Sequence, residues 1–430
     1  MNPARKSARG ERRLNWLLAS SAVSNLGDGI GKVAFPLLAA TLTRDPLLIA
    51  GLSAAQFVPW LLFALLTGAM LDRVDRRRAV LVANLVRAVV VGATGLLVLT
   101  GSASIWLVYL AALLIGTAET VADSAANVLI PSVVERSRLD AANSKLQGCE
   151  IVGQTFLGGP IGSVTFAVFA AMPFLLNSVG FAVAAALLLG MAGSYRPRRP
   201  AGEPVRLRTE LAGGLRWLRH NPLLVRLVLI AALVSLTTEL AQAQLVLYAL
   251  EDLRLSPAAF GLLALAGGLG GLAGAAVAPA LIRACGRHRV LAGGVLAGGL
   301  AFTAMGLCRV ASVSAALFGL FAAAVVAVNV VLGSARHSLV PGELLGRVLG
   351  VWRTAVWGAI PVGALLGGLL TRWLGGPAST FLTSGLLQLA LAGFAWYSLR
   401  GFSLESPPVP ARREPAAQAA PVARYSDRSG

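Results

Sequence analysis

Long apolar runs separated by short polar connections dominate the chain. A membrane-spanning helix needs about 20 consecutive apolar residues. Runs of this kind predict twelve such helices, at 14–42, 47–71, 79–99, 105–130, 143–170, 172–193, 223–250, 257–282, 290–308, 313–333, 346–370 and 377–400. Glycine and proline inside these runs are compatible with helices, because membrane helices tolerate both. The predicted fold class is therefore an all-α polytopic membrane protein.

One long polar stretch divides the predicted helices into two sets of six. Residues 194–222 hold seven arginines and form a central loop between an N-terminal bundle, 14–193, and a C-terminal bundle, 223–400. A short basic segment, 1–13, precedes the first bundle. The tail, 401–430, is rich in Pro, Ala and Arg and has no apolar periodicity, so we expect it to be disordered.

The composition is typical of a membrane protein, but the charge needs an explanation. Apolar residues make up 56% of the chain and charged residues only 13%, whereas soluble domains carry about 25% charged residues. The formal net charge is nevertheless +18. A chain this basic is typical of nucleic-acid-binding proteins, so the positions of the basic residues must decide between the two interpretations.

The basic residues lie mainly on one side of the predicted membrane. Of the 37 Lys and Arg, 29 lie in the terminal segments and the even-numbered connections, and 4 lie in the odd-numbered ones. The positive-inside rule places that basic side, with both termini, in the cytoplasm. The arginines form no continuous face, which argues against nucleic acid as a partner. Arg outnumbers Lys by 34 to 3, which suggests a GC-rich bacterium and thus a multi-pass protein of the bacterial inner membrane.

The two halves resemble each other in sequence. Arg76-Arg77-Arg78 precedes the third predicted helix, and Arg287-His288-Arg289 precedes the ninth, 211 residues later. Leu129-Ile130-Pro131 and Leu339-Val340-Pro341 are 210 residues apart. A parallel repeat of this kind is typical of alternating-access transporters, whose site lies at mid-depth between the halves.

The connection after the second predicted helix carries a family resemblance. Residues 68–78 read Gly-Ala-Met-Leu-Asp-Arg-Val-Asp-Arg-Arg-Arg and resemble the loop between helices 2 and 3 of the major facilitator superfamily. Residues 26–28, 116–123 and 138–143 resemble the branch that includes the enterobactin exporter and macrolide effluxers. The resemblance covers all twelve predicted helices. It implies the major facilitator fold and export, and leaves the substrate open.

This connection also predicts a cytoplasmic gate. Gly68 permits close helix approach, and Asp72 can cap a helix end. The neighbouring arginines can pair with Asp123 near the inner end of the fourth predicted helix. The alternative is a basic loop that only fixes the topology. The predicted gate comprises Gly68, Asp72, Arg73, Arg76, Arg77 and Asp123.

The fifth predicted helix resembles a signature of exporters in the same superfamily. Gly159, Pro160 and Gly162 match the first part of a G-P-x-x-G-G pattern, while the second glycine pair is out of step. The small residues permit close packing, and the proline removes a backbone hydrogen bond. Ordinary helix packing is the alternative interpretation of this motif.

Ionisable residues inside the predicted helices are candidates for proton coupling or substrate binding, because each is costly in lipid without a partner or a cavity. Asp28 and Glu239 are 211 residues apart, so they occupy equivalent positions on the first predicted helix of each half. A rise of ~1.5 Å per residue places them ~21 Å and ~24 Å along their helices, beyond the midplane toward the outside. Asp28 can alternatively pair with Lys32. Glu119 can pair with Arg87, either for coupling or for stability.

Several chemistries are excluded or unsupported. No G-x-x-x-x-G-K-[ST] motif is present, so direct ATP use is not expected. Three cysteines and three histidines, far apart, predict neither disulfides nor a metal site. We expect no enzymatic activity and no cofactor, with the proton gradient as the energy source.

The sequence thus predicts a proton-coupled antiporter that exports an amphipathic small molecule, such as a drug, siderophore or secondary metabolite. Its expected partners are that substrate and the lipid bilayer, and we expect a monomer. An importer of a small solute is one alternative, and a membrane scaffold or sensor without transport is another. Buried carboxylates argue against the scaffold, since a bundle that transports nothing gains stability by replacing them.

Overall fold

Helices form nearly the whole of the described chain. The computed structural model describes residues 3–71, 74–134, 138–191, 193, 195 and 207–402, and no strand occurs within those ranges. The predicted gate residues Asp72 and Arg73 lie outside the described residues, as does the tail from 403 onward.

The N-terminal half contains six membrane-crossing segments. They are α1 (Pro3–Leu42), α2 (Pro46–Leu71), α3 (Arg76–Leu99), α4 (Ile105–Val133), a fifth segment made of α5 (Leu139–Glu150), the π-helix η2 (Ile151–Gly158) and α6 (Gly159–Val168), and α7 (Met172–Leu189). Between the halves lies the short helix α8 (Leu207–Arg219).

The C-terminal half also contains six membrane-crossing segments. Its first segment combines α9 (Pro222–Gln242), α10 (Leu245–Leu247) and the π-helix η3 (Tyr248–Asp252). The others are α11 (Pro257–Cys285), α12 (Arg287–Leu307), α13 (Ala311–Leu339), α14 (Gly342–Leu374) and α15 (Pro377–Ser398).

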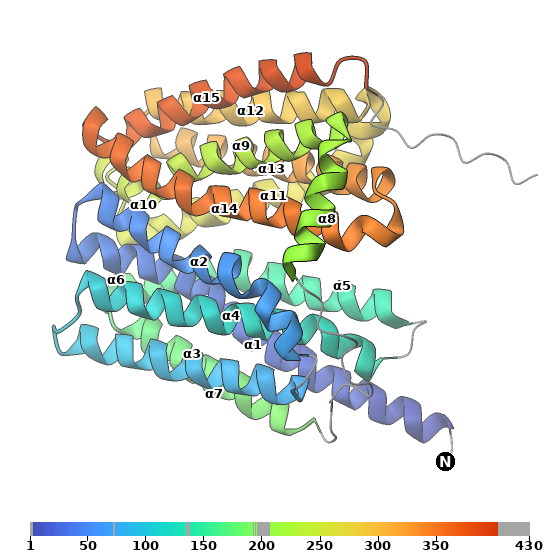
Figure 1. The fold of residues 1–430 in the computed structure, drawn as a ribbon. Helices are drawn as coiled ribbons and strands as arrows, with labels where there is room; N and C mark the ends of the chain where they lie inside the picture. The colour runs from blue at the N-terminus through green and yellow to red at the C-terminus, as the bar shows by residue number, and fades with distance from the viewer. Residues whose placement is uncertain are drawn as a thin grey trace, which may run out of the picture.

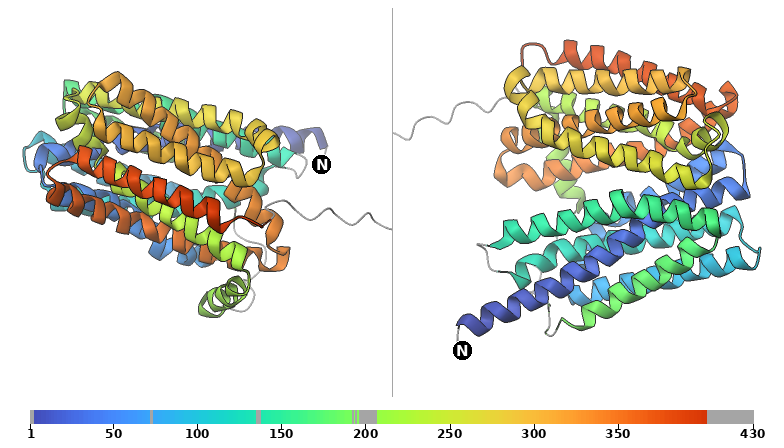
Figure 2. Two further views of the ribbon diagram at one scale, coloured as in Figure 1. Left: turned by 90° about the horizontal axis from the view of Figure 1, so that it is seen from above. Right: turned by 180° about the vertical axis from the view of Figure 1, so that it is seen from behind.

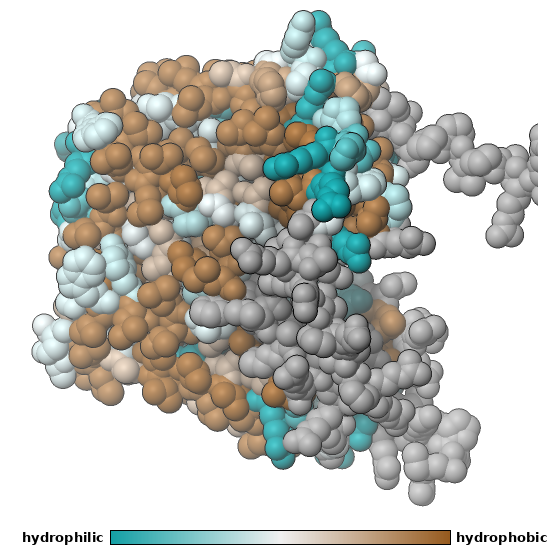
Figure 3. Space-filling model, viewed as in Figure 1, coloured by the Kyte–Doolittle hydropathy of each residue, from teal (hydrophilic) through white to brown (hydrophobic). Residues whose placement is uncertain are grey.

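The predicted membrane architecture is confirmed. Ten segments of the described chain are long and apolar enough to cross a membrane, and α1 and α2 complete the twelve. The axes of the membrane-crossing helices lie roughly parallel to one another (Figure 1). Apolar side chains cover much of the molecular surface along their length (Figure 3). That surface replaces water contact with lipid contact, which explains how so few charged residues suffice.

The six segments of each half pack together, and the two halves lie one above the other (Figures 1 and 2). We call the end of the bundle that carries the N-terminus the terminal end, and the opposite end the outer end. Polar contacts between the halves gather at the outer end: Arg44 pairs with Glu251 at 3.4 Å, and Arg372 pairs with Asp45 at 3.0 Å. These pairs join the two halves at the outer end.

A glycine permits the close contact of α2 with α14 at the same end. A Cβ atom on Gly368 would lie 2.8 Å from the Cα of Leu47 and 2.8 Å from the carbonyl oxygen of Pro46. Both distances are shorter than van der Waals contact, so any larger residue would separate the two helices. Nearby, the side-chain amide of Gln244 donates to the carbonyl oxygen of Pro46 at 3.1 Å.

The helix α8 is a feature that the sequence did not predict, since 194–222 reads as a polar loop. It runs across the terminal ends of the membrane-crossing helices (Figure 1). Its Leu218 is buried in the apolar cluster of the C-terminal half, while Arg216 and Arg219 are exposed. A helix with one apolar and one basic face is typical of a position at the membrane surface.

Candidate functional site

Two tryptophans from opposite halves meet near the middle of the molecule. The ring of Trp60 on α2 stands edge-on to the ring of Trp357 on α14, with centroids 5.2 Å apart and an interplanar angle of 86°. A cavity of about 330 Å³, which we call the N-terminal cavity, lies among α1, α2, α4 and α7. A second one of about 340 Å³, the C-terminal cavity, lies among α9, α13 and α14. Trp357 lines both.

An ion pair between Arg87 and Asp28 lies beside the N-terminal cavity. The Arg87 guanidinium donates to a carboxylate oxygen of Asp28, and their side chains are 1% and 10% exposed. The same guanidinium lies over the ring of Phe181, 4.5 Å from its centroid. A charge buried this completely needs a partner of opposite sign. Asp28 supplies that partner.

This pairing differs from both alternatives that the sequence left open. Arg87 pairs with Asp28 and not with Glu119, although both acids line the N-terminal cavity. Lys32 does not pair with Asp28 either. Its ammonium group donates to the side-chain oxygen of Gln154, which comes from η2.

The ion pair lies near the middle of a membrane-crossing helix, because Arg87 is near the middle of α3 (Arg76–Leu99). The helix α1 begins at Pro3 and projects from the bundle at its N-terminal end (Figure 2). The position of Asp28 relative to the membrane midplane stays a prediction.

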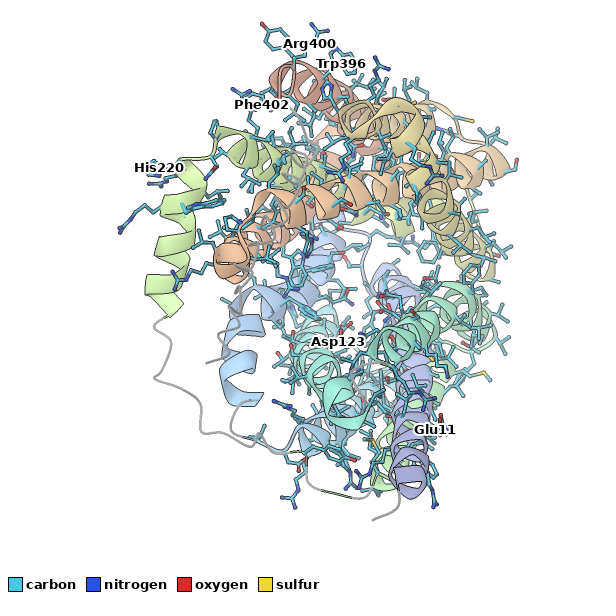
Figure 4. All side chains as sticks on the ribbon, turned by 90° about the vertical axis from the view of Figure 1, so that its right-hand side faces the viewer. Glu11, Asp123, His220, Trp396, Arg400 and Phe402 are labelled. Carbon is cyan, nitrogen blue, oxygen red and sulfur yellow. The ribbon has the colours of Figure 1, made fainter. Side chains whose placement is uncertain are left out.

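Two further acids lie on α4, one helical turn apart. Glu119 lines the N-terminal cavity and interacts electrostatically with Asp28, Arg87 and Lys32. Asp123 is exposed and lies on the side of its half that faces the other half (Figure 4). No ion pair between described side chains includes either acid. Neither carboxylate is thus neutralised by a cation among the described side chains.

The arginines of the predicted gate contact backbone carbonyls. Arg77 donates to the carbonyl oxygens of Leu188 and Leu189 at 2.8 and 3.2 Å, where α7 ends. Arg76 donates to the carbonyl oxygen of Val128 on α4 at 3.4 Å. Cations favour the C-terminal end of a helix, where carbonyls lack intrahelical partners. These arginines tie α3 to its neighbours, and a pairing with Asp123 stays a prediction. Gly68 lies in the last turn of α2.

Asp75 is a structural residue that the sequence analysis missed. One oxygen of its carboxylate accepts from the backbone N–H of Arg78 at 3.2 Å and caps α3. The other accepts from the backbone N–H of Tyr195 at 2.9 Å. Burial raises the pKa of the Tyr195 phenol in this same corner. The signal was available, since an Asp directly before a helix start is a common cap.

The C-terminal cavity combines one acid with two arginines. Glu239 on α9 lines it and has no hydrogen bond or ion pair with the described side chains. Arg336 lies over the ring of Trp352, and Arg353 lies over the ring of Trp357, each 5.4 Å from the ring centroid. Cation–π contacts of this kind hold the guanidiniums without consuming a carboxylate.

The glycine motif of the fifth segment lies at helix contacts. A Cβ atom on Gly162 would lie 2.8 Å from the carbonyl oxygen of Ile30 on α1. One on Gly159 would lie 3.5 Å from the Cβ of Ala264, across the interface with α11. Pro160, near the end of η2, lacks the N–H that a regular α-helix would use, which accounts for a local change of helix type. The motif therefore lies where α1, the fifth segment and α11 meet.

The π-helix brings Gln154 to polar side chains of α1, which the sequence did not predict. Its amide nitrogen donates to the side-chain oxygen of Asn25 at 2.7 Å, and its oxygen accepts from Lys32. Gln154 thus connects the fifth segment to two points on α1, one turn on either side of Asp28. The only available signal was the density of glycine around it.

Comparison with known proteins gives one family over nearly the whole chain. The family model described as "Transmembrane secretion effector" matches residues 10–422. The multidrug efflux pump Tap of Mycolicibacterium fortuitum is 26% identical over 406 residues, covering 91% of this chain and 97% of Tap. The MFS-type transporter YfiS of Bacillus subtilis (strain 168) is 24% identical over 400 residues, covering 89% of this chain and 92% of YfiS.

Solved structures share the fold at low identity. The nucleoside transporter NupG superimposes with a TM-score of 0.75 at 11% identity, covering 90% of this chain and all of the NupG chain. A bacterial homologue of the lysosomal transporter Spinster, solved in an inward-facing and unoccupied conformation, has a TM-score of 0.72 at 14% identity, covering 93% of this chain and 98% of its own. The chain is thus a multi-pass membrane transporter that belongs to the transmembrane secretion effector family of the major facilitator superfamily.

Proposed function

We propose that the protein exports an amphipathic small molecule across the bacterial inner membrane in exchange for protons, by alternating access. The observation that supports this most directly is the set of acids around the two central cavities. Glu119 and Glu239 line the cavities without an ion-pair partner among the described side chains, and Asp28 holds the buried Arg87. Acids at mid-depth in a transporter are suited to carry protons.

The Asp28–Arg87 pair is the natural centre of coupling. A proton that neutralises Asp28 would leave Arg87 buried without its counter-ion, which is unfavourable. Glu119 is within electrostatic reach of both and can take over as the counter-ion. Proton binding would thus change which acid faces Arg87, and so change the packing of α1 against α3 and α4. Protonation would in this way move α1, which lines the N-terminal cavity.

The cavity walls favour an amphipathic substrate. Trp60 and Trp357 form an aromatic surface between the cavities, and charges of both signs lie on either side of it. Aromatic rings take apolar and cationic groups alike. Export of such a molecule agrees with the similarity to Tap, a multidrug efflux pump. Import of a small solute is the alternative.

The orientation proposed from the basic residues places the terminal end in the cytoplasm. The closed outer end then corresponds to an inward-facing conformation, with Asp123 on the cytoplasmic side of Glu119. The three acids Asp123, Glu119 and Asp28 would form a path for protons between the cytoplasm and mid-depth. We propose a monomer, in which one chain supplies both cavities and the proton gradient supplies the energy.

Everted membrane vesicles with a pH-sensitive dye test this proposal. A panel of amphipathic compounds should contain members that release protons from energised vesicles containing the protein. That release should be lost in Asp28→Asn and in Glu239→Gln, and kept in Glu150→Gln, because Glu150 is exposed and outside both cavities. Full coupling in both cavity variants would refute the site. Proton-linked accumulation of a compound in intact cells would show import, and the proposed direction of transport would then be wrong.

A further inference from the structure

An apolar groove opens on the side of the C-terminal half, away from the central cavities. It has a volume of about 430 Å³ and lies among α11, α12 and α13. Small residues such as Gly274 and Gly293 form part of its lining. Leu281 and Leu320 line it as well and are 42% and 49% exposed, so the groove opens toward the hydrocarbon of the bilayer.

Among the described residues that line this groove, one is basic, and it lies at the terminal end. Arg289, in the first turn of α12, lines the groove and is exposed. Within the described ranges its guanidinium has no hydrogen bond or ion pair, and no acidic residue lines the groove. The N-cap of α12 is Gly286, which provides no side-chain acceptor for the first N–H groups. The charge at this point is therefore positive and unopposed.

An equivalent groove occurs in the N-terminal half, at positions related by the sequence repeat. It has a volume of about 540 Å³ and is lined by residues of α3 and α4, with Arg78 at its terminal end. Arg78 and Arg289 are 211 residues apart, as are the lining residues Val82 and Gly293. Here, however, Asp75 also lines the groove and caps the helix.

We infer that the groove of α11, α12 and α13 binds an anionic phospholipid, with an acyl chain along the apolar lining and the headgroup phosphate at Arg289. Phosphate is suited to a guanidinium and to an uncapped helix start. The groove of α3 and α4 should bind the same lipid more weakly, because the carboxylate of Asp75 lies beside Arg78 and already caps the helix. Of these two grooves, the one of α11, α12 and α13 has no acid among its described lining residues.

Native mass spectrometry of the purified full-length protein in detergent tests this inference. Phosphatidylglycerol and phosphatidylcholine of equal chain length are titrated separately, and the retained adducts are counted. One basic residue at a membrane surface contributes about a fivefold preference for an anionic lipid. We expect that preference in the native protein, its loss in Arg289→Gln, and a smaller reduction in Arg78→Gln.

Two further variants separate the groove from charge in general. Gly293 lines the groove, and a Cβ atom there meets nothing within 4 Å. Gly293→Leu should therefore occupy part of the groove and also abolish the preference. Arg283→Gln removes an exposed arginine of α11 that does not line the groove and should change nothing. Equal reductions in Arg283→Gln and Arg289→Gln would overturn the inference. A full preference in Gly293→Leu would also overturn it, because the phosphate alone would then be bound. Equal binding of both lipids by the native protein would overturn it as well.

Discussion

Arg87 on α3 and Asp28 on α1 form a buried ion pair between side chains that are 59 residues apart in the chain. The pair lies beside a cavity that also contains Glu119. Its position makes two demands on the fold. The charge of Arg87 must be compensated in every conformation, and an acid must stay within reach of it while the cavity changes access.

Removing one partner of this pair should destabilise the protein strongly. Arg87→Met leaves the carboxylate of Asp28 without its counter-ion, and loss of one partner in a buried pair costs about 3–5 kcal/mol. We expect a clear drop in the unfolding temperature of the purified protein. The double variant Asp28→Asn with Arg87→Met should recover much of the loss, because no uncompensated charge remains. Additive losses in the double variant would show that the two residues act independently.

The tryptophan contact between the cavities should matter for substrate binding. Trp357→Ala removes the shared wall and a T-shaped contact with Trp60, and such contacts contribute about 0.5–1.5 kcal/mol. We expect KM for an amphipathic substrate to rise by about twofold to tenfold, with little change in the maximal rate, in vesicle transport assays. Trp373→Ala is the control, because Trp373 is 73% exposed and lines neither cavity. Equal effects in both variants would contradict a role in binding.

Linking the halves at the outer end should stop transport. Asp45→Cys with Arg372→Cys, joined by a short thiol-specific cross-linker, would fix the contact that the ion pair makes at 3.0 Å. Transport should fall to background and return if the linker is cleaved. The matched control is Asp252→Cys with Arg309→Cys, which joins an ion pair of 4.0 Å within the C-terminal half. Continued transport with the halves linked would mean that the outer end does not open.

The close approach of the fifth segment to α1 should not tolerate a larger residue. A Cβ atom on Gly158 would lie 2.4 Å from the Cα of Gly29. Gly158→Val should therefore cost about 1–3 kcal/mol of stability through overpacking, visible as a lower yield of folded protein and a lower unfolding temperature. Gly148→Ala serves as the control, since a Cβ there meets nothing within 4 Å. A stable Gly158→Val protein would show that α1 can move aside.

Much of the site could be anticipated from the sequence, but not its connections. The acids Asp28, Glu119 and Glu239 stand out because ionisable residues are rare in apolar spans. Which acid meets Arg87 depends on the positions of α1, α3 and α4 and on their rotation about their axes. The contact of Gln154 with Lys32 depends on a π-helix, which shifts the following residues around the helix axis.

The fold itself followed from local properties of the chain. The length of an apolar run sets a membrane crossing whatever its neighbours do, because the hydrocarbon core has a fixed thickness. The division at 194–222 and the basic residues on one side are likewise visible along the chain. The amphipathic helix α8 was overlooked because its 13 residues are too few for an apolar run and lie within a segment rich in arginine.

The sequence by itself therefore determined the twelve helices, the two repeated halves and the set of buried charges. Only the tertiary structure decided that Asp28 and not Glu119 binds Arg87, that Trp60 and Trp357 meet between two cavities, and that the halves close at the outer end. The physical reason is that hydrophobic burial acts on whole segments, whereas ion pairs and ring contacts need atoms within a few ångströms. Those distances are set by the tilt and rotation of the helices relative to one another, which the sequence of a single segment does not determine.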